Sequence, residues 1–425
     1  MVTSFDDLVT ALDCADVVAR SHPQFGAGKV LQFSLKQIPG QLGFLGEYAR
    51  LAVTFEDVNG QQHDLRYFVK CLPFSDPKQR KIIQDFGIFA KEATGYRELF
   101  SRFNQDPQKV TKWRPDCWLM RDDLIIMEDL QIAGFLSMPY GQEFGKQHMM
   151  LIFDRMAQMH ACSLDLEYNQ LKGEKLEPKF AAALAENTFM RESVWFGVGL
   201  KGILTVAVEA SKYSQNDVYR KIMQTEMVSK MDRIYNLVQP ADSYQSVIIH
   251  RDLWFNNMMF RFAQSSSQDT VDYTKPLDCV LIDFQVSRYL PPAIDFLCTL
   301  HLLTMKHHRD ELFHTYVEHY YQSLTEKLKN LNLSIVKILP KEQFLETLDH
   351  YRLVGLLWSG VLLAYVNLPD GYIADLHQRD PVAYHEFGLI SRDKVILENI
   401  RKEGYFRTRL LDAVDETVEY LFGFE

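Results

Sequence analysis

One stretch of the chain, residues 247–260 (VIIHRDLWFNNMMF), places polar side chains at a spacing that suits transfer chemistry. An apolar run leads into His250, Arg251 and Asp252, and Asn257 follows just before a second apolar run. This order predicts a strand, a polar loop and a strand. Phosphoryl transfer uses an Asp to accept the proton of the attacking hydroxyl and an Asn to hold Mg²⁺ on nucleotide phosphates, and H-R-D-x-x-x-x-N is a spacing that supplies both. We therefore predict catalytic roles for Asp252 and Asn257.

A second acidic group follows in residues 278–289 (DCVLIDFQVSRY), where a short apolar run ends at Asp283. Proteins usually hold Mg²⁺ with one or two carboxylate groups together with substrate phosphates. Asn257 and Asp283 satisfy that requirement, so we predict both as metal ligands and Asp283 as a third catalytic residue. Taken alone, an apolar strand that ends in Asp is equally consistent with a strand that has a polar end.

Lys70 and Glu92 are the expected partners of this site. Lys70 lies among apolar residues in a predicted strand over residues 64–72, where an ammonium group needs a partner or solvent. Glu92 lies beside the apolar stripe of a predicted helix over residues 77–103, where an unpaired carboxylate is costly. Either residue alone could be an ordinary surface charge. With the loop motif they predict the ion pair that clamps nucleotide phosphates.

Two further segments are predicted to contact the nucleotide. The loop over residues 39–46 contains Gly43 and Gly46, and glycines let a backbone approach phosphates closely. The G-x-x-G-x-x-G spacing differs from that of protein kinases, so a plain flexible hairpin remains an alternative. Strands give way to helices after Glu128 and Leu130. A nucleotide base is expected to hydrogen-bond to the backbone at this boundary.

Composition limits the class of protein. The 425 residues suffice for two lobes, and the 47% hydrophobic and 24% charged content is typical of a soluble globular protein. A net charge of −10 provides no basic excess for a nucleic-acid backbone, so we expect no nucleic-acid partner. The six cysteines show no metal-ligand spacing, and the N-terminus lacks a basic signal region. We expect a cytoplasmic monomer without a membrane span, in which the apolar residues 353–368 form a buried helix.

The order of elements predicts an α+β, protein-kinase-like fold with two lobes. An N-terminal lobe over residues 1–130 would hold a five-stranded antiparallel sheet and the long helix 77–103. A mostly helical lobe over residues 131–425 would carry the catalytic loop 250–257 and the substrate pocket. The pair Asn59-Gly60 predicts a tight hairpin, because both residues tolerate positive φ. The helices expected in the second lobe span residues 144–163, 179–196, 200–212, 217–237, 294–307, 311–331, 340–366, 384–403 and 407–422.

Two features distinguish this chain from protein kinases. Gln285 stands where protein kinases carry the Gly of Asp-Phe-Gly. Residues 283–295 are also too few for a phosphorylatable activation loop. The large helical region is better suited to enclosing a small molecule, and segments 190–204 and 354–368 are candidates for lining its pocket.

The sequence resembles the ecdysteroid kinase-like (CHK kinase-like) family, which is abundant in insects and related to aminoglycoside and choline kinases. The resemblance covers roughly residues 28–415 and is carried by FVKCLP, MEDL, HRDLWFNNMMF and LIDFQVSRYLPPAIDF. It implies ATP- and Mg²⁺-dependent phosphorylation of a small-molecule hydroxyl, with an ecdysteroid or a xenobiotic alcohol as acceptor and detoxification as one role.

The resemblance also implies individual roles. Asp252 becomes the catalytic base, Asn257 and Asp283 the Mg²⁺ ligands, Lys70 the phosphate clamp and Glu92 its partner. His250 would brace the loop, and Asp295 would support it from behind. Arg251 replaces the Gly that relatives commonly carry, and we expect the loop to tolerate it because protein kinases use Arg at this position.

Two other functions stay open. A catalytically silent carrier of a hormone or toxin would not need all five polar residues of the site. A choline-type or aminoglycoside-type kinase would need an aromatic cage for its cation. Trp195, Trp254 and Trp358 could form one, although we favour the interpretation that they are core residues. His160 is likewise expected to be a packed core histidine.

Overall fold

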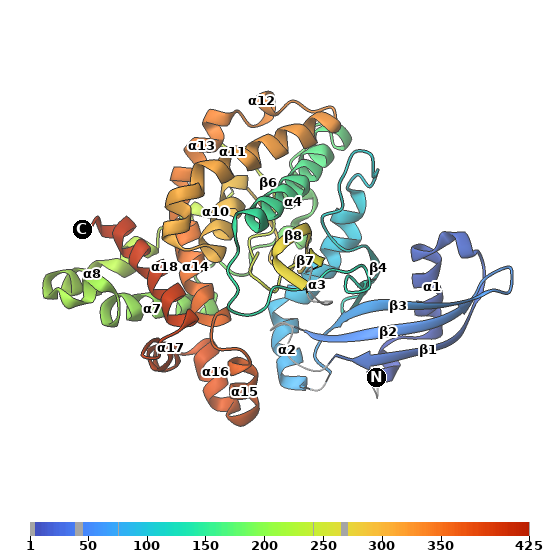
Figure 1. Ribbon diagram of the computed structural model, residues 1–425, viewed down its shortest axis with the longest axis horizontal. Helices are drawn as coiled ribbons and strands as arrows, with labels where there is room; N and C mark the ends of the chain where they lie inside the picture. Colours follow the sequence, from blue (N-terminus) through green and yellow to red (C-terminus); the bar gives the residue numbers. More distant parts are fainter. Residues whose placement is uncertain (1–4, 39–45, 75, 241, 265–270, 425) are drawn as a thin grey trace.

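The computed structural model describes residues 5–38, 46–74, 76–240, 242–264 and 271–424. The N-terminal part forms a five-stranded antiparallel sheet in the order β1-β2-β3-β5-β4. Its strands are β1 Lys29–Gln37, β2 Glu47–Glu56, β3 Gln62–Cys71, β4 Cys117–Met120 and β5 Leu124–Glu128. Helix α1 (Ala11–Ser21) covers one face, and its apolar side joins the alternating buried residues of the sheet in one core (Figure 1). The predicted five strands are therefore confirmed.

The hairpin between β2 and β3 differs in detail from the prediction. The strands pair up to Glu56 and Gln62, and the N–H of Asp57 donates to the carbonyl of Gln61 at 2.9 Å. In this turn only Gly60 has a positive φ, of 80°. The connection is thus a loop of five residues rather than a tight turn. The Asp57 carboxylate stabilises this loop because it accepts backbone N–H groups within it.

The continuous helix predicted over residues 77–103 is wrong. Helix α2 (Pro77–Phe86) ends at Gly87, whose φ of 66° is left-handed, and α3 (Ile88–Thr94) starts anew. A π-helical turn and a 3₁₀ turn follow, over Gly95–Leu99 and Phe100–Arg102. Glycine takes the left-handed conformation without a Cβ clash, and this conformation ends a helix. Glu92 remains helical, on α3.

Helices make up most of the chain after β5 (Figure 1). The first group comprises α4 Lys146–Asp165, α5 Leu176–Lys179, α6 Ala181–Leu184, α7 Val194–Glu209, α8 Asp217–Met231 and α9 Ile234–Leu237. The predicted helix over residues 179–196 is therefore wrong over residues 185–193. Here the Glu186 carboxylate accepts the N–H groups of Asn187, Thr188 and Phe189 at 2.8–3.1 Å. Such local side-chain bonds compete with the helical hydrogen bonds.

Two short antiparallel pairs lie among these helices. Strand β6 (Val247–Ile249) pairs with β9 (Arg288–Leu290), and β7 (Met258–Gln264) pairs with β8 (Val271–Leu281). The polar insertion predicted over residues 263–275 forms the end of the second hairpin, and its residues 265–270 lie outside the described part. The loops that join β6 to β7 and β8 to β9 carry the predicted catalytic residues.

The C-terminal region is helical to the end. Its helices are α10 Pro292–Leu303, α11 Lys306–Asn330, α12 Ile335–Ile338, α13 Lys341–His350, α14 Arg352–Val366, α15 Tyr372–Arg379, α16 Pro381–Leu389, α17 Asp393–Ile400 and α18 Tyr405–Phe422. Three predicted helices, over residues 217–237, 340–366 and 384–403, each prove to be two. From Leu353 onwards every residue of α14 is buried, as expected for a core helix.

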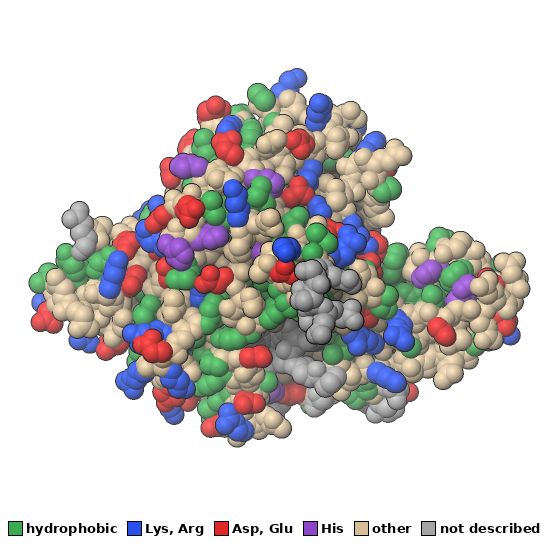
Figure 2. Space-filling view, viewed as in Figure 1, with side chains coloured by type: hydrophobic (Ala, Val, Ile, Leu, Met, Phe, Trp, Pro, Cys, Tyr) green, Lys and Arg blue, Asp and Glu red, His purple; other side chains and the backbone are tan. Residues whose placement is uncertain are grey.

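The surface mixes charges of both signs, with acidic and basic side chains interspersed over the face that Figure 2 shows. Among the described residues, the structure has no helix with the length and apolarity that a membrane span requires. The division into lobes at residue 130 stays a prediction.

Candidate active site

The loop between β6 and β7 is held by a buried carboxylate from the start of α10. Asp295 is fully buried, and its two oxygens accept the backbone N–H groups of His250 (2.9 Å) and Arg251 (2.6 Å). Arg251 has a φ of 69°, a conformation that costs energy for a residue with a side chain. The two hydrogen bonds stabilise this turn. The prediction that Asp295 supports the loop from behind is confirmed.

His160 supports Asp295 in turn. Its Nε2 lies 3.1 Å from Asp295 Oδ2, and its Nδ1 lies 2.7 Å from the Tyr320 hydroxyl. A carboxylate only accepts, so Nε2 carries the hydrogen of the bond to Asp295. Burial would raise the pKa of Asp295, but the hydrogen bonds and positive charge of His160 and His250 together outweigh burial and hold this pKa below its ordinary value. His160 is a packed core histidine, as predicted, and its ring belongs to the support of the loop.

Asp252 and Asn257 contact each other within the loop. The Asn257 amide nitrogen donates to the backbone carbonyl of Asp252 at 2.8 Å and to its carboxylate at 3.0 Å. His250 Nε2 lies 2.9 Å from the carbonyl of Ile282, the residue before Asp283, so His250 braces this loop against the next one. Burial and then the charge of Asp283 raise the pKa of Asp252 well above its ordinary value. A raised pKa makes a carboxylate a better proton acceptor.

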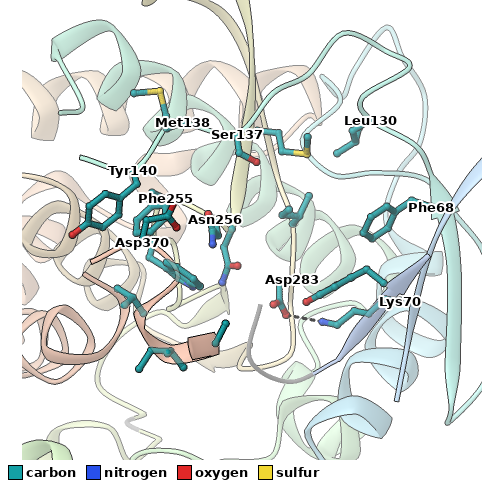
Figure 3. A pocket seen from close by; sticks show the side chains of 18 of the residues that line it. Phe68, Lys70, Leu130, Ser137, Met138, Tyr140, Phe255, Asn256, Asp283 and Asp370 are labelled. Carbon is teal, nitrogen blue, oxygen red and sulfur yellow. Dashed lines mark hydrogen bonds and ion pairs between the residues drawn. The ribbon is translucent and has the colours of Figure 1, made fainter. Parts of the chain in front are cut away.

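Lys70 joins Glu92 and Asp283 across the cleft. Its ammonium lies 2.6 Å from Glu92 Oε2 and 3.0 Å from Asp283 Oδ1 (Figure 3). The predicted pairing of Lys70 with Glu92 is confirmed, and both side chains are buried. Burial lowers the pKa of Lys70, but the charges of Asp283 and Glu92 more than offset this effect and keep Lys70 cationic. Glu92 also accepts the N–H of Phe284 at 3.2 Å, which links α3 to the Asp283 loop.

Lys70, Glu92, Asn257 and Asp283 border a cavity of about 630 Å³ between the sheet and the helical part. Asp252 is not among the lining residues, although its carboxylate contacts Asn257, which is. Figure 3 shows Lys70 and Asp283 at one side and Tyr140, Phe255 and Asp370 at the other. The lining also includes Met127, Glu128, Asp129, Leu130 and Gln131 from the segment predicted to contact the base. Proteins bind small molecules in cavities of about this size, with a few polar groups among apolar ones.

The structure places the remaining predicted nucleotide contacts as follows. Glu128 and Leu130 line the cavity, although the Glu128 carboxylate pairs with Lys112 at 2.6 Å. Gly46 lies against β3, where an added Cβ would come within 3.2 Å of the Cys71 carbonyl. Gly43 lies outside the described residues.

The far wall of the cavity is largely apolar and aromatic. It consists of Tyr140, Trp254, Phe255, Tyr365, Val366, Leu368, Pro369, Tyr372, Ile373 and Ala374, with Asn256 and Asp370 as polar members. Segment 354–368 thus contributes as predicted, through its last residues. Segment 190–204 contributes none of the described lining residues, so that prediction is wrong. Its helix α7 packs against α14 and α8, within the helical core.

The three tryptophans do not share one site around this cavity. Trp254 lines it, whereas Trp195 and Trp358 pack against each other with ring centroids 6.2 Å apart and do not line it. The guanidinium of Arg392 lies 4.5 Å from the centre of the Trp195 ring. A cation of the protein therefore already covers that ring. The interpretation of Trp195 and Trp358 as packing residues is confirmed.

The residues present fit a magnesium nucleotide. Among the described residues there is no group of three His, Cys, Asp or Glu side chains that could hold a metal alone. Asn257 uses its amide nitrogen on Asp252, which leaves the amide oxygen for a cation, and Asp283 adds a carboxylate. Two oxygen ligands with open positions suit Mg²⁺, which is usually completed by water and substrate phosphates.

Sequence reasoning missed several residues of this region. Tyr140 and Asp370 come from segments that no motif marks, and Phe255 lies within the predicted catalytic loop but was given no role. Glu186 was placed in a predicted helix, although it binds Arg251, next to Asp252. A charged residue sixty-five positions upstream of its partner carries no local signal.

Comparisons with known proteins agree with the sequence motifs. The family model described as the ecdysteroid kinase-like family matches residues 42–333. A comparison with curated proteins finds no match. Two solved structures are similar, each at 14% identity. The first is the streptomycin–ATP ternary complex of APH(2″)-IIa, with a TM-score of 0.31; the match covers 89% of this chain and 99% of that chain. The second is aminoglycoside phosphotransferase APH(2″)-Ib with ADP, with a TM-score of 0.32; the match covers 95% of this chain and 97% of that chain. The chain belongs to the ecdysteroid kinase-like family and is a phosphotransferase that acts on hydroxyl groups of small molecules.

Proposed function

We propose that this enzyme transfers the γ-phosphoryl group of ATP to a hydroxyl of a lipophilic alcohol such as an ecdysteroid or a xenobiotic. The observation that supports this most is the composition of the cavity. Lys70, Asn257 and Asp283 lie on one side of it, and an aromatic and apolar wall lies on the other. One side thus suits a polyphosphate with its cation, and the other suits an apolar acceptor.

Asp252 would orient the acceptor hydroxyl and take its proton. Its buried carboxylate has a raised pKa, so it accepts a proton more readily than an exposed Asp. The hydrogen bond from Asn257 fixes the direction of one carboxylate oxygen. Such fixed positioning contributes much of the rate in phosphoryl transfer, where the protein has little covalent chemistry to perform.

Lys70 would hold the phosphates, and Glu92 would hold Lys70. The ammonium lies in a buried environment, where its attraction to phosphate oxygens is stronger than in water. Asn257 and Asp283 would hold Mg²⁺, which neutralises charge on the phosphates when bound. In this arrangement Asp283 contacts both the ammonium and the cation, and so couples Lys70 to the metal site.

The acceptor side favours an apolar molecule over choline. Trp195 is covered by Arg392, and Trp358 is buried in the core, so of the three tryptophans considered for a choline cage only Trp254 lines the cavity. Asp370 is an exposed carboxylate in an otherwise apolar wall, and we propose that it hydrogen-bonds a second hydroxyl of the acceptor. Phosphorylation would add negative charge to a lipophilic molecule, which suits detoxification. The cytoplasmic location and the monomeric state stay predictions.

The test measures phosphate transfer from labelled ATP to ecdysteroids, lipophilic plant alcohols, aminoglycosides and choline. We expect a labelled product from a lipophilic alcohol with the wild-type protein and none with Asp252→Asn. Transfer to choline or an aminoglycoside alone would refute the acceptor class. Stabilisation by Mg²⁺-ATP, read as a thermal shift, separates an enzyme from a carrier, because a silent carrier would not be stabilised.

A further inference from the structure

A carboxylate outside the cavity connects the segments that hold the proposed catalytic groups. Glu186 lies between α6 and α7. Its Oε2 accepts a hydrogen bond from Arg251 Nη1 at 2.6 Å, and its Oε1 accepts one from Arg251 Nη2 at 3.1 Å. The Nε atom of Arg288 on β9 lies 3.7 Å from Glu186 Oε2. The Arg251 guanidinium also lies 4.4 Å from the centre of the Phe189 ring. The side chain of Arg251 is thus fixed on two sides.

Each cation around Glu186 is close in sequence to a proposed catalytic residue. Arg251 precedes Asp252, and Arg288 follows the loop that begins at Asp283. Lys91 precedes Glu92 on α3, which packs against α6. The Lys91 ammonium is buried and has no hydrogen-bond partner among the residues that the structure describes. Glu186 therefore pairs with Arg251 and shares Arg288 with Glu177, whose Oε1 lies 3.4 Å from Arg288 Nη2.

Glu186 is itself fixed. Its Oε1 accepts the N–H groups of the three residues that follow it, so the carboxylate cannot turn without losing those bonds. Arg251 and Arg288 are buried, with exposures of 0% and 5%, and buried cations without a counter-charge are strongly unfavourable. The backbone of Arg251 is also held at a φ of 69°. Glu186 thus neutralises the buried side chain of Arg251, while Asp295 holds the backbone of the same residue.

We propose that Glu186 is a positioning residue for phosphoryl transfer, which holds the catalytic loop and the Asp283 loop in register through Arg251 and Arg288. This inference rests on the proposed function for its effect on the rate. It also explains why residues 185–193 leave the helical pattern: the segment presents a carboxylate to buried arginines.

The test compares Glu186→Gln with the wild-type protein in two measurements. ATP turnover with water or an acceptor should show kcat lowered about 10²-fold, because a shift of about 1 Å in a catalytic group costs about that much. The KM for ATP should change less than kcat, since Lys70 keeps its ion pair with Glu92. Hydrogen exchange of the amides in residues 247–257 should be faster in the variant, and this measurement needs no turnover.

Glu416→Gln is the matched control. Glu416 is also a buried carboxylate that binds arginines, namely Arg309 and Arg352, but it lies on α18. This control should lose stability without a change in kcat or in loop exchange. Equal kcat and equal loop exchange in Glu186→Gln would overturn the inference. If the wild-type protein turns over no ATP but loop exchange is faster in Glu186→Gln, the positioning role would be upheld and the proposed function refuted.

A double variant covers the case in which Glu186→Gln does not fold. Glu186→Gln with Arg251→Gln removes one charge of each sign, and neutral replacement of a buried pair is often tolerated. We expect this double variant to fold and to remain slow. A folded double variant with wild-type kcat would show that the rate does not depend on the Glu186–Arg251 pair and would overturn the proposal.

Discussion

Replacing Asp295 by Asn is expected to destabilise the catalytic loop and to slow the reaction. Asp295 accepts three hydrogen bonds in a fully buried position, from the backbone of His250 and of Arg251 and from the ring of His160. An amide offers one accepting oxygen and one donating nitrogen. In either orientation the amide nitrogen faces a backbone N–H that then has no acceptor.

The size of the effect follows from these contacts. One buried N–H without an acceptor costs about 1–3 kcal/mol, and each remaining hydrogen bond loses about 1 kcal/mol when its charged acceptor becomes neutral. The free energy of unfolding should therefore fall by about 3–5 kcal/mol, which is also typical of breaking a buried ionic contact. A displaced loop should lower kcat about 10²-fold.

The pH dependence gives the same prediction a second test. Asp295 has a lowered pKa in the folded protein, so its stabilising contribution is complete above the ordinary pKa of about 3.9 and is lost as pH falls below that value. The wild-type protein and Asp295→Asn should thus differ most at neutral pH. Their free energies of unfolding should converge in acid.

Urea unfolding and ATP turnover measure these effects. Asp412→Asn is the control, because Asp412 on α18 also accepts a backbone N–H, from Lys306 at 2.8 Å, but has no contact with the loop. The control should lose less stability and keep its kcat. Wild-type unfolding and wild-type kcat in Asp295→Asn would refute the account of the loop.

Three further substitutions test the rest of the site. Lys70→Met should lower kcat/KM about 10²–10³-fold, and it should destabilise the fold because Glu92 is then buried without its cation. The double variant Lys70→Met, Glu92→Gln should regain the wild-type urea midpoint but not the turnover. Asp252→Asn should lower kcat about 10²–10⁴-fold. The pKa of Asp252 is raised in the folded protein, so its ionised form destabilises the fold as pH rises above about 3.9. Asp252→Asn removes this charge and should therefore unfold at an equal or higher urea concentration at pH 7. Asp370→Asn should raise the KM for the acceptor and leave the KM for ATP unchanged, as steady-state kinetics in both substrates can measure.

The parts of the site that were predictable are those with a local pattern. The apolar runs around Asp252 and Asp283 fix two strand ends, and the pairing of Lys70 with Glu92 follows from the cost of burying either charge alone. The strand predicted over residues 64–72 corresponds to β3, Gln62–Cys71. These signals need only neighbours in sequence.

The parts that were not predictable depend on long-range packing or on single residues. The stop at Gly87 interrupts a good helical pattern, and such glycines are often tolerated within helices. Glu186 occurs in a segment of helix-forming residues, and its partners only become apparent once the chain has folded. The wall around Asp370 is assembled from segments between residues 137 and 374, so no single stretch indicates the shape of the acceptor.

The central claim is that this site moves the γ-phosphoryl group of ATP to an acceptor hydroxyl through Asp252. The most direct test is a single-turnover reaction with γ-¹⁸O-labelled ATP and a lipophilic alcohol, followed by mass spectrometry of the acceptor. The account predicts that the acceptor gains an ¹⁸O-labelled phosphoryl group in the reaction of the wild-type protein. It predicts no labelled acceptor in the reactions of Asp252→Asn and Asp283→Asn. Equal labelling by Asp252→Asn, or an unlabelled acceptor in every reaction of a wild-type protein that binds Mg²⁺-ATP, would contradict it.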